Sequence, residues 1–111
     1  MVQYQSIDRT FAALADPTRR AVLERLGSGA ATVTELAAPA GISLTGMKKH
    51  LRVLEAAGLV RSEKVGRSRR CELGPKRLDD VRTWVEDYRQ TVEERFDRLG
   101  ELLDRDKGGS R

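Results

Sequence analysis

Two helix start signals separated by a sharp break, within residues 32–58, constrain this fold more than any other feature of the sequence. Thr32 and Glu35 have the spacing of a capping box, in which two side chains satisfy free backbone N–H groups at the start of a helix. Pro39 and Gly41 limit this first helix to about two turns. A new start signal follows within a few residues, so the sequence predicts two short helices joined by a tight turn, a helix-turn-helix.

The second of these helices is expected to span about residues 43–57, from a Ser43 cap to a stop at Gly58. Its apolar residues share one face, and its basic residues fall mainly on other faces. A cationic outer face suits the major groove of DNA, which is wide enough to admit a helix. The expected DNA contacts on this helix are Ser43, Thr45, Gly46, Lys48, Lys49, His50 and Arg52.

Three positions of this helix have two interpretations each. Leu44 either contacts the methyl group of a thymine or packs inward. Gly46 destabilises a helix by about 1 kcal/mol relative to Ala. A glycine at this position either lets the backbone approach DNA closely or is simply tolerated. His50 is either partly buried with one hydrogen bond or in contact with a phosphate group.

About residues 59–73 predict a β-hairpin with a glycine at its tip. Arg67, Arg69 and Arg70 make this hairpin a basic finger, which we expect to contact phosphates or enter the minor groove. Cys71 is interpreted as a small buried residue or, alternatively, as a redox switch whose thiolate the neighbouring arginines favour. A helix-turn-helix followed directly by such a hairpin, or wing, is a winged helix.

Two more helices are expected before residue 32. Ser6 is expected to cap the first, and Asp16 with Pro17 begins the second. Arg19 and Arg20 follow that cap, and we expect one of them to bond a carboxylate and the other to reach a phosphate.

The distribution of charge supports a polyanionic partner. The 111 residues include 21 Lys and Arg and 17 Asp and Glu, for a net charge of +4. Residues 43–70 contain eight basic and two acidic residues, a net +6, whereas residues 76–107 contain eight basic and ten acidic residues, a net −2. A solvated basic surface is the alternative interpretation of the middle segment.

About residues 75–105 predict one helix of roughly 30 residues, ~45 Å long, with apolar residues spaced by three and four. Such a helix is too long to bury its apolar seam within so small a chain, so we expect a homodimer. The expected interface residues of this helix are Leu78, Val81, Trp84, Val85, Tyr88, Val92, Phe96 and Leu99. The aromatic residues alternatively line a small-molecule pocket between two long helices. Residues 106–111 are expected to form a frayed tail.

Composition excludes several classes of protein. One cysteine and one histidine cannot supply a four-ligand zinc site, and no apolar run approaches the ~20 residues of a membrane span. The sequence offers no phosphate-binding glycine loop and no nucleophile–base pair, so we expect no enzyme and no cofactor. The expectation is a single cytoplasmic domain over residues 1–111, with no membrane partner.

Three stretches together resemble the ArsR family of bacterial winged-helix transcriptional regulators: residues 14–20 (LADPTRR), 49–55 with 57–60 (KHLRVLE, AGLV) and 66–70 (GRSRR). The resemblance covers about residues 7–103. It implies a mainly α fold with a small β-hairpin wing in the order α-α-α-α-β-β-α. It also implies a homodimer formed by the terminal helices, with Ile7 and Phe11 of the first helix in the interface. Such a dimer binds an imperfect palindrome in double-stranded DNA, usually as a repressor.

The sequence departs from the metal-sensing members of that family. Residues 34–38 lack the cysteines of one known metal site, and the last helix has carboxylates but no histidine for another. Carboxylates alone are poor ligands for soft metals, so we expect no metal site and leave a small-molecule effector unidentified. The rival function is a protein-interaction module, in which the long amphipathic helix docks on another protein and DNA affinity is only non-specific.

Overall fold

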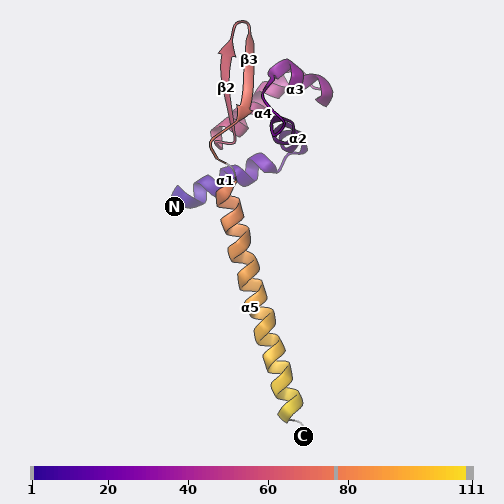
Figure 1. The fold of residues 1–111 in the computed structure, drawn as a ribbon, viewed down its shortest axis with the longest axis vertical. Coiled ribbons are helices and arrows are strands. Elements are labelled where there is room, and N and C mark those ends of the chain that lie inside the picture. Colours follow the sequence, from indigo (N-terminus) through magenta and orange to yellow (C-terminus); the bar gives the residue numbers. More distant parts are fainter. Residues whose placement is uncertain (1, 77, 110–111) are drawn as a thin grey trace. The chain divides into compact units, whose positions relative to one another are not determined.

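A computed structural model describes residues 2–76 and 78–109, and the side chains of 7–76 and 78–105. The chain divides into two units, Met1–Asp79 and Asp80–Arg111, which are described in turn. The first unit contains α1 (Val2–Leu14), α2 (Pro17–Leu26), β1 (Ala31–Thr32), α3 (Val33–Ala40), α4 (Leu44–Ala56), β2 (Val60–Val65) and β3 (Ser68–Leu73), and the second contains the long helix α5 (Asp79–Gly109) (Figure 1).

Local capping signals place three helix starts as the sequence predicts. The Asp16 carboxylate accepts hydrogen bonds from the backbone N–H groups of Thr18 and Arg19, and Pro17 occupies the first position of α2. The capping box at Thr32 is formed, and Ser43 caps α4. The expected cap at Ser6 is wrong, because α1 begins at Val2 and no Gly or Pro interrupts the helix before Ser6.

The expected β-hairpin forms, with Ser68 as the first residue of its second strand, and it belongs to a sheet of three strands. All pairs are antiparallel in the order β1-β3-β2, with Val65 opposite Ser68 at the hairpin end. The additional strand β1 places Ala31 opposite Cys71. Two residues are too few to show an alternating pattern, which is why the sequence did not predict this strand.

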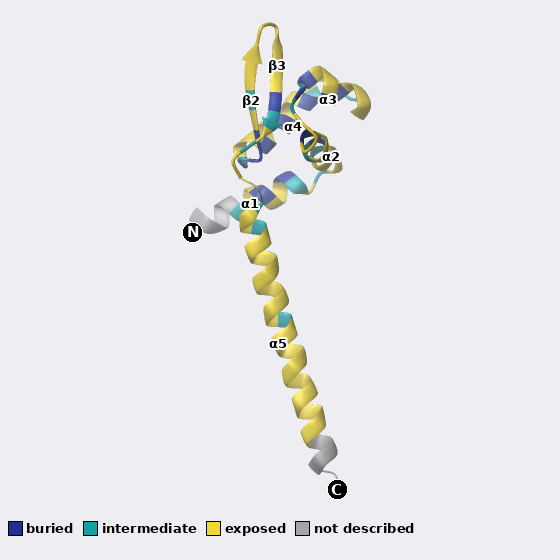
Figure 2. Cartoon of the chain, in the orientation of Figure 1, coloured by how far each residue is buried: buried dark blue, intermediate teal, exposed yellow. Residues whose placement is uncertain are grey.

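One hydrophobic core holds the first unit together. Its buried residues come from every helix and strand of the unit, and Figure 2 shows them as dark blue segments; the largest side chains with full burial are Met47, Leu54 and Cys71. Burial raises the pKa of the Cys71 thiol, and the charge of Glu55 adds to this rise while that of Arg69 opposes it. The buried interpretation of Cys71 is confirmed, and the expected thiolate-favouring environment is not found.

Helix α5 begins later and ends later than the sequence predicts. The backbone N–H groups of Gly74 and Lys76 donate to the carbonyl oxygens of Leu59 and Gly58, at 2.8 and 3.2 Å, which holds residues 74–76 outside the helix. A Cβ on Gly74 would lie 2.4 Å from the Gly58 carbonyl oxygen, so this close approach requires glycine.

Leu78 precedes α5, with a φ of 63°, and its side chain packs partly buried against the core of the first unit. It is therefore not the first member of the helical seam, which begins at Val81. The expected frayed tail at residues 106–111 is wrong for residues 106–109, which continue the helix, and residues 110–111 lie outside the described part. No helix among the described residues is both long and apolar enough to span a membrane.

Candidate DNA interface

Helix α4 separates an apolar face from a polar one, as its spacing predicts. Met47, Leu51 and Leu54 are buried in the core. The exposed residues on the remaining faces include Thr45, Lys48, Lys49 and Arg52. The expected DNA-contacting residues of α4 therefore lie where a nucleic acid has access to them.

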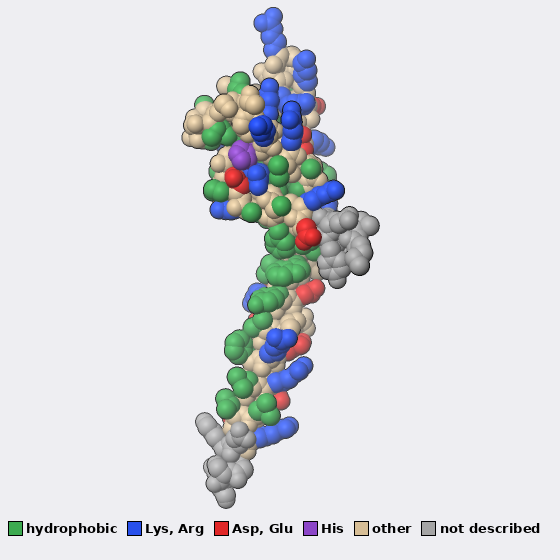
Figure 3. All heavy atoms as spheres, turned by 180° about the vertical axis from the view of Figure 1, so that it is seen from behind, with side chains coloured by type: hydrophobic (Ala, Val, Ile, Leu, Met, Phe, Trp, Pro, Cys, Tyr) green, Lys and Arg blue, Asp and Glu red, His purple; other side chains and the backbone are tan. Residues whose placement is uncertain are grey.

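A groove of about 270 Å³ lies between the start of α3, the start of α4 and the hairpin. We call it the cationic groove; it is lined by Thr32, Val33, Thr34, Leu44, Lys48, Lys64, Arg67, Ser68 and Arg69. A smaller cavity of about 100 Å³ also has Lys48 and Arg69 in its wall, together with Leu51, Arg52 and Glu55. Figure 3 shows Lys and Arg side chains gathered on this unit near its histidine. The structure thus joins α4 and the wing into one positively charged surface.

The wing arginines divide between the two faces of the hairpin. Arg67 and Arg69 line the cationic groove. Arg69 donates to the Ser62 hydroxyl at 3.3 Å, and that hydroxyl donates to Glu55 of α4, so Arg69 faces α4. Arg70 lies on the opposite face, where it shares a separate cavity with Arg61, Ser62, Glu63 and Glu72. The structure therefore does not bring Arg70 together with the other expected DNA contacts.

Lys64 is a groove residue that the sequence analysis missed. It lies directly opposite Arg69 in the hairpin, and cross-strand partners point to the same face of a sheet. Once the hairpin tip is placed at Gly66 and Arg67, this pairing follows from the spacing alone. The signal was present in the sequence and was not used.

Gly46 lies against the cap of its own helix. The Ser43 hydroxyl accepts a hydrogen bond from the Gly46 N–H group at 3.0 Å. A Cβ at position 46 would lie 3.3 Å from that hydroxyl oxygen, which is tighter than ordinary contact. A side chain at this position would therefore need the Ser43 hydroxyl to shift by a few tenths of an ångström.

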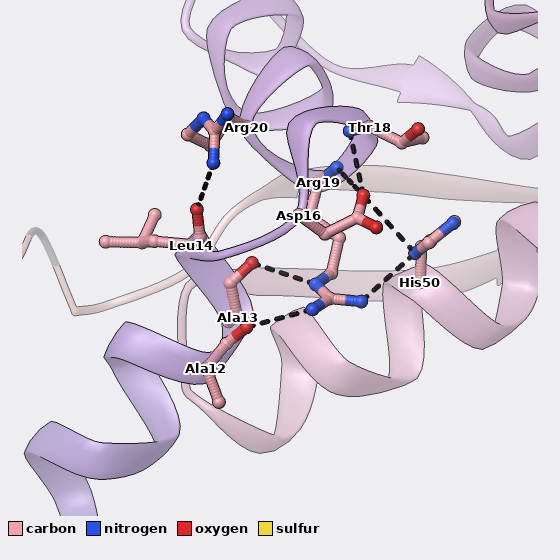
Figure 4. A network of polar contacts seen from close by, with 8 residues as sticks. All are labelled: Ala12, Ala13, Leu14, Asp16, Thr18, Arg19, Arg20 and His50. Atoms are coloured by element: carbon pink, nitrogen blue, oxygen red, sulfur yellow. Dashed lines mark hydrogen bonds and ion pairs between the residues drawn. The ribbon is translucent and has the colours of Figure 1, made fainter.

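His50 lies in a polar network that connects α4 to α1 and α2 (Figure 4). Its Nδ1 atom is 3.2 Å from Nη1 of Arg19 and 4.0 Å from a carboxylate oxygen of Asp16. Because a guanidinium only donates, Nδ1 accepts in the first contact, which assigns the proton of a neutral ring to Nε2. The interpretation of His50 as partly buried and hydrogen-bonded is confirmed, and a phosphate contact stays a prediction.

Arg19 and Arg20 stabilise the end of α1. Arg19 donates to the carbonyl oxygens of Ala13 and Ala12 at 2.8 and 2.9 Å, and Arg20 donates to that of Leu14 at 2.7 Å. The last carbonyl groups of a helix have no partners within it, so these bonds complete α1. Among the described residues, neither arginine forms the expected hydrogen bond to a carboxylate, although the charge of Arg19 contributes to the lowered pKa of Asp16.

Arg19→Ala is expected to lower the free energy of unfolding by about 1–3 kcal/mol, since it removes charge-assisted bonds to two carbonyl groups and to His50. Arg20→Ala is the matched control, because Arg20 is exposed and makes one such bond, and its effect should be smaller. Urea denaturation monitored by circular dichroism measures both changes. Equal destabilisation in the two variants would contradict this role of Arg19.

The pKa of Asp16 lies below its ordinary value of 3.8. The backbone N–H group of Arg19 contributes most to the lowering, and the N–H group of Thr18 and the charges of His50 and Arg19 add to it, while desolvation opposes it. A carboxylate with a lowered pKa stabilises the fold above its unfolded-state pKa and loses this effect as the pH falls through its folded-state pKa.

Asp16→Asn is therefore expected to reduce the acid dependence of stability. Asn caps a helix about as well as Asp does but cannot be protonated, so the cap stays and the titration disappears. The wild type should be the more stable protein at neutral pH, and its advantage should shrink below about pH 4. Urea denaturation from neutral pH to about pH 3 provides the comparison. An advantage that stays constant over this range would rule out the assignment.

The second unit carries the other expected surface. Trp84, Tyr88, Phe96 and Leu99 of α5 are 47–67% exposed, and Figure 3 shows a green apolar stripe along this helix. Trp84 and Tyr88 stack with ring centroids 5.5 Å apart. The remaining expected interface residues of α5 are Val81 and Val92, which are half-buried, and Val85, which is exposed. On α1, Ile7 is half-buried and Phe11 is exposed.

The part of the chain that the structure describes contains no cluster of potential metal ligands. Within residues 7–76 and 78–105 no three His, Cys, Asp or Glu side chains are grouped so that they could hold a metal ion. The absence of a metal site in the whole protein stays a prediction.

Comparisons with known proteins identify the family. A helix-turn-helix domain model matches residues 14–63. The chain is 43% identical over 83 residues to the HTH-type transcriptional regulator Rv2034 of Mycobacterium tuberculosis (strain ATCC 25618 / H37Rv), which is 75% of this chain and 78% of that protein. It is 29% identical over 79 residues to the transcriptional repressor SdpR of Bacillus subtilis (strain 168), covering 71% of this chain and 88% of that one.

A solved structure agrees with this assignment. The crystal structure of an ArsR family transcriptional regulator is 42% identical and superposes with a TM-score of 0.76, over 80% of this chain and 92% of that one. This likeness includes the helix-turn-helix and extends beyond it to most of the fold. The chain belongs to the ArsR family of winged helix-turn-helix transcriptional regulators.

Proposed function

We propose that this protein is a homodimer that binds a palindromic operator and represses transcription by covering a promoter. The observation that carries the proposal is the cationic groove, in which α4 and the wing present Lys48, Lys64, Arg67 and Arg69 on one accessible surface. Lys and Arg side chains bind DNA phosphates without regard to sequence, and residues at the start of a recognition helix contact base edges.

The proposed DNA contacts follow from this surface. Lys48, Lys49, Arg52, Lys64, Arg67 and Arg69 supply affinity through phosphates, and Thr45 and Lys48 supply specificity at base edges. Ser43 and Gly46 shape the start of the helix, and His50 positions it through Arg19. Arg70 faces the other side of the hairpin, so we propose that it contacts only the phosphates of an adjacent strand.

The exposed apolar stripe of α5 supports the homodimer. Large apolar side chains repeated every three or four residues along a helix bury their surface when a second such helix packs against them. A dimer with a two-fold axis also presents two recognition helices to successive major grooves, which matches the symmetry of a palindrome.

Repression is the proposed direction of regulation, because the related SdpR is named a transcriptional repressor. The protein acts in the cytoplasm, as one domain, and carries out no chemical reaction. Its release from DNA is proposed to need no metal.

The test is fluorescence anisotropy of the chelator-treated protein on a duplex from upstream of its own gene, beside a scrambled duplex, across a salt series. We expect tight binding confined to the upstream duplex, with affinity falling as salt rises. Equal, weak and strongly salt-dependent binding to both duplexes would overturn the proposal and favour the protein-interaction module.

A further inference from the structure

Leu44 is a large apolar side chain left exposed at the start of α4. It precedes Met47 by three residues, so it continues the stripe formed by Met47, Leu51 and Leu54. Those three side chains are 0%, 3% and 0% exposed, whereas Leu44 is 47% exposed. The stripe therefore runs beyond the edge of the core, and inward packing, one of the two sequence interpretations, is not what the structure shows.

The surroundings of Leu44 are polar and charged. It lines the cationic groove, most of whose other members carry hydroxyl, ammonium or guanidinium groups. Val33, the other apolar member, is only 5% exposed. Among the described residues that line the groove, Leu44 is thus the one apolar side chain with a substantial exposed surface.

The chemistry of a DNA major groove offers one match to this side chain. The floor of that groove presents hydrogen-bond donors and acceptors, together with a single kind of apolar group, the C5 methyl of thymine. A leucine side chain neither donates nor accepts hydrogen bonds. Lys48 and Arg67 line the same groove, and ammonium and guanidinium groups are suited to bind the phosphates that flank such a base.

We propose that Leu44 is a specificity-determining residue that recognises a thymine methyl group in each half of the operator. The inference rests on the proposed function, since it concerns the same DNA surface. It adds an apolar contact to the specificity residues Thr45 and Lys48, which act through hydrogen bonds. A position of the operator contacted by Leu44 prefers thymine over the other three bases.

Leu44 shares the cationic groove with Val33 at the start of α3, and a role in packing there makes a different prediction. If packing were its only role, truncating Leu44 would lower stability and would leave the discrimination between thymine and uracil unchanged. A methyl-sensitive measurement on DNA therefore separates recognition from packing.

The experiment replaces thymines with deoxyuridine, which lacks only the C5 methyl group. The operator is first located by footprinting of the upstream duplex, and each thymine of a half-site is then replaced singly. Dissociation constants are measured by anisotropy for the wild type, for Leu44→Ala and for Val53→Ala. Val53 is the matched control, because it is 38% exposed on the same helix and does not line the groove.

For the wild type and Val53→Ala, we expect one replacement per half-site to weaken binding about fourfold, the effect of exposing one buried methyl group. Leu44→Ala should bind the unmodified operator about fourfold more weakly than the wild type, and replacing the sensitive thymine should not weaken its binding further. The effects of the protein substitution and of the base replacement are then non-additive, as expected for two groups in direct contact. Leu44→Asn, which keeps the branching and approximate size of the side chain but makes its end polar, should show the same insensitivity.

Two results would overturn the inference. One is a wild type that is insensitive to every replacement, which needs no protein variant and so does not depend on how well Leu44→Ala folds. The other is a Leu44→Ala variant that shows the same weakening on replacement as the wild type. Both leave specific binding intact, whereas equal binding to operator and scrambled duplex would instead overturn the proposed function together with this inference.

Discussion

Replacing both Lys48 and Lys49 with Ala is expected to abolish specific DNA binding and to leave the fold and the dimer intact. Both side chains are exposed on α4, and Lys48 lies in the cationic groove. Charge-assisted hydrogen bonds contribute about 1.5–3 kcal/mol each, so removing two should weaken binding on the order of 100-fold or more. The slope of log K against log salt concentration should fall by about one for each phosphate that the variant no longer binds.

The matched control for this variant removes two positive charges elsewhere. Arg25 on α2 and Arg89 on α5 are exposed, at 45% and 62%, and both lie outside the groove. Arg25→Ala with Arg89→Ala should change the affinity only through the small effect of net charge. Anisotropy titrations measure binding, and light scattering with circular dichroism verifies mass and helicity. If the Lys48 and Lys49 variant retains wild-type affinity, α4 is not the recognition helix.

Replacing Val85 and Val92 with Glu is expected to dissociate the dimer. The two residues lie seven positions apart in the apolar stripe of α5, so a two-fold interface would bury four carboxylates. Desolvating a charge without a partner costs several kcal/mol, which should weaken dimerisation on the order of 100-fold or more. DNA binding should weaken as well, because a monomer binds one half-site without the second, linked subunit that raises the affinity of a dimer for the whole operator.

Thr83→Glu with Gln90→Glu is the matched control for the interface. These positions are exposed on α5 and are likewise seven residues apart, and they lie outside the apolar stripe, so the same charges are added on another face. This control should remain a dimer by light scattering and sedimentation. A Val85 and Val92 variant that also remains dimeric would show that α5 is not the interface.

The parts of the fold that the sequence predicted rest on signals within one or two turns of chain. Asp16 with Pro17, the capping box at Thr32 and the Ser43 cap each satisfy backbone groups of the helix they begin. Such bonds need no information from distant residues. The same holds for the hairpin, whose register follows from its tip.

The parts that were missed depend on contacts between distant segments. Strand β1 exists because Ala31 pairs with Cys71, and α5 begins late because Gly74 pairs with the backbone at Leu59. Arg19 and His50 meet across 31 positions of sequence, which no spacing rule reveals. In the candidate site, the sequence identified the cations of α4 and of the hairpin tip, and strand alternation places Arg70 on the face opposite Cys71. Which of these cations share one groove with α4 depends on how the hairpin packs against that helix.

Hydroxyl-radical footprinting of the upstream duplex tests the central claim most directly, that two recognition helices of one homodimer bind successive major grooves. We expect two equally protected patches on one face of the duplex, with their centres ~10 bp or a multiple apart. The Lys48 and Lys49 variant should protect neither patch. A single patch, or uniform protection along the duplex, would contradict dimeric recognition of a palindrome by this protein.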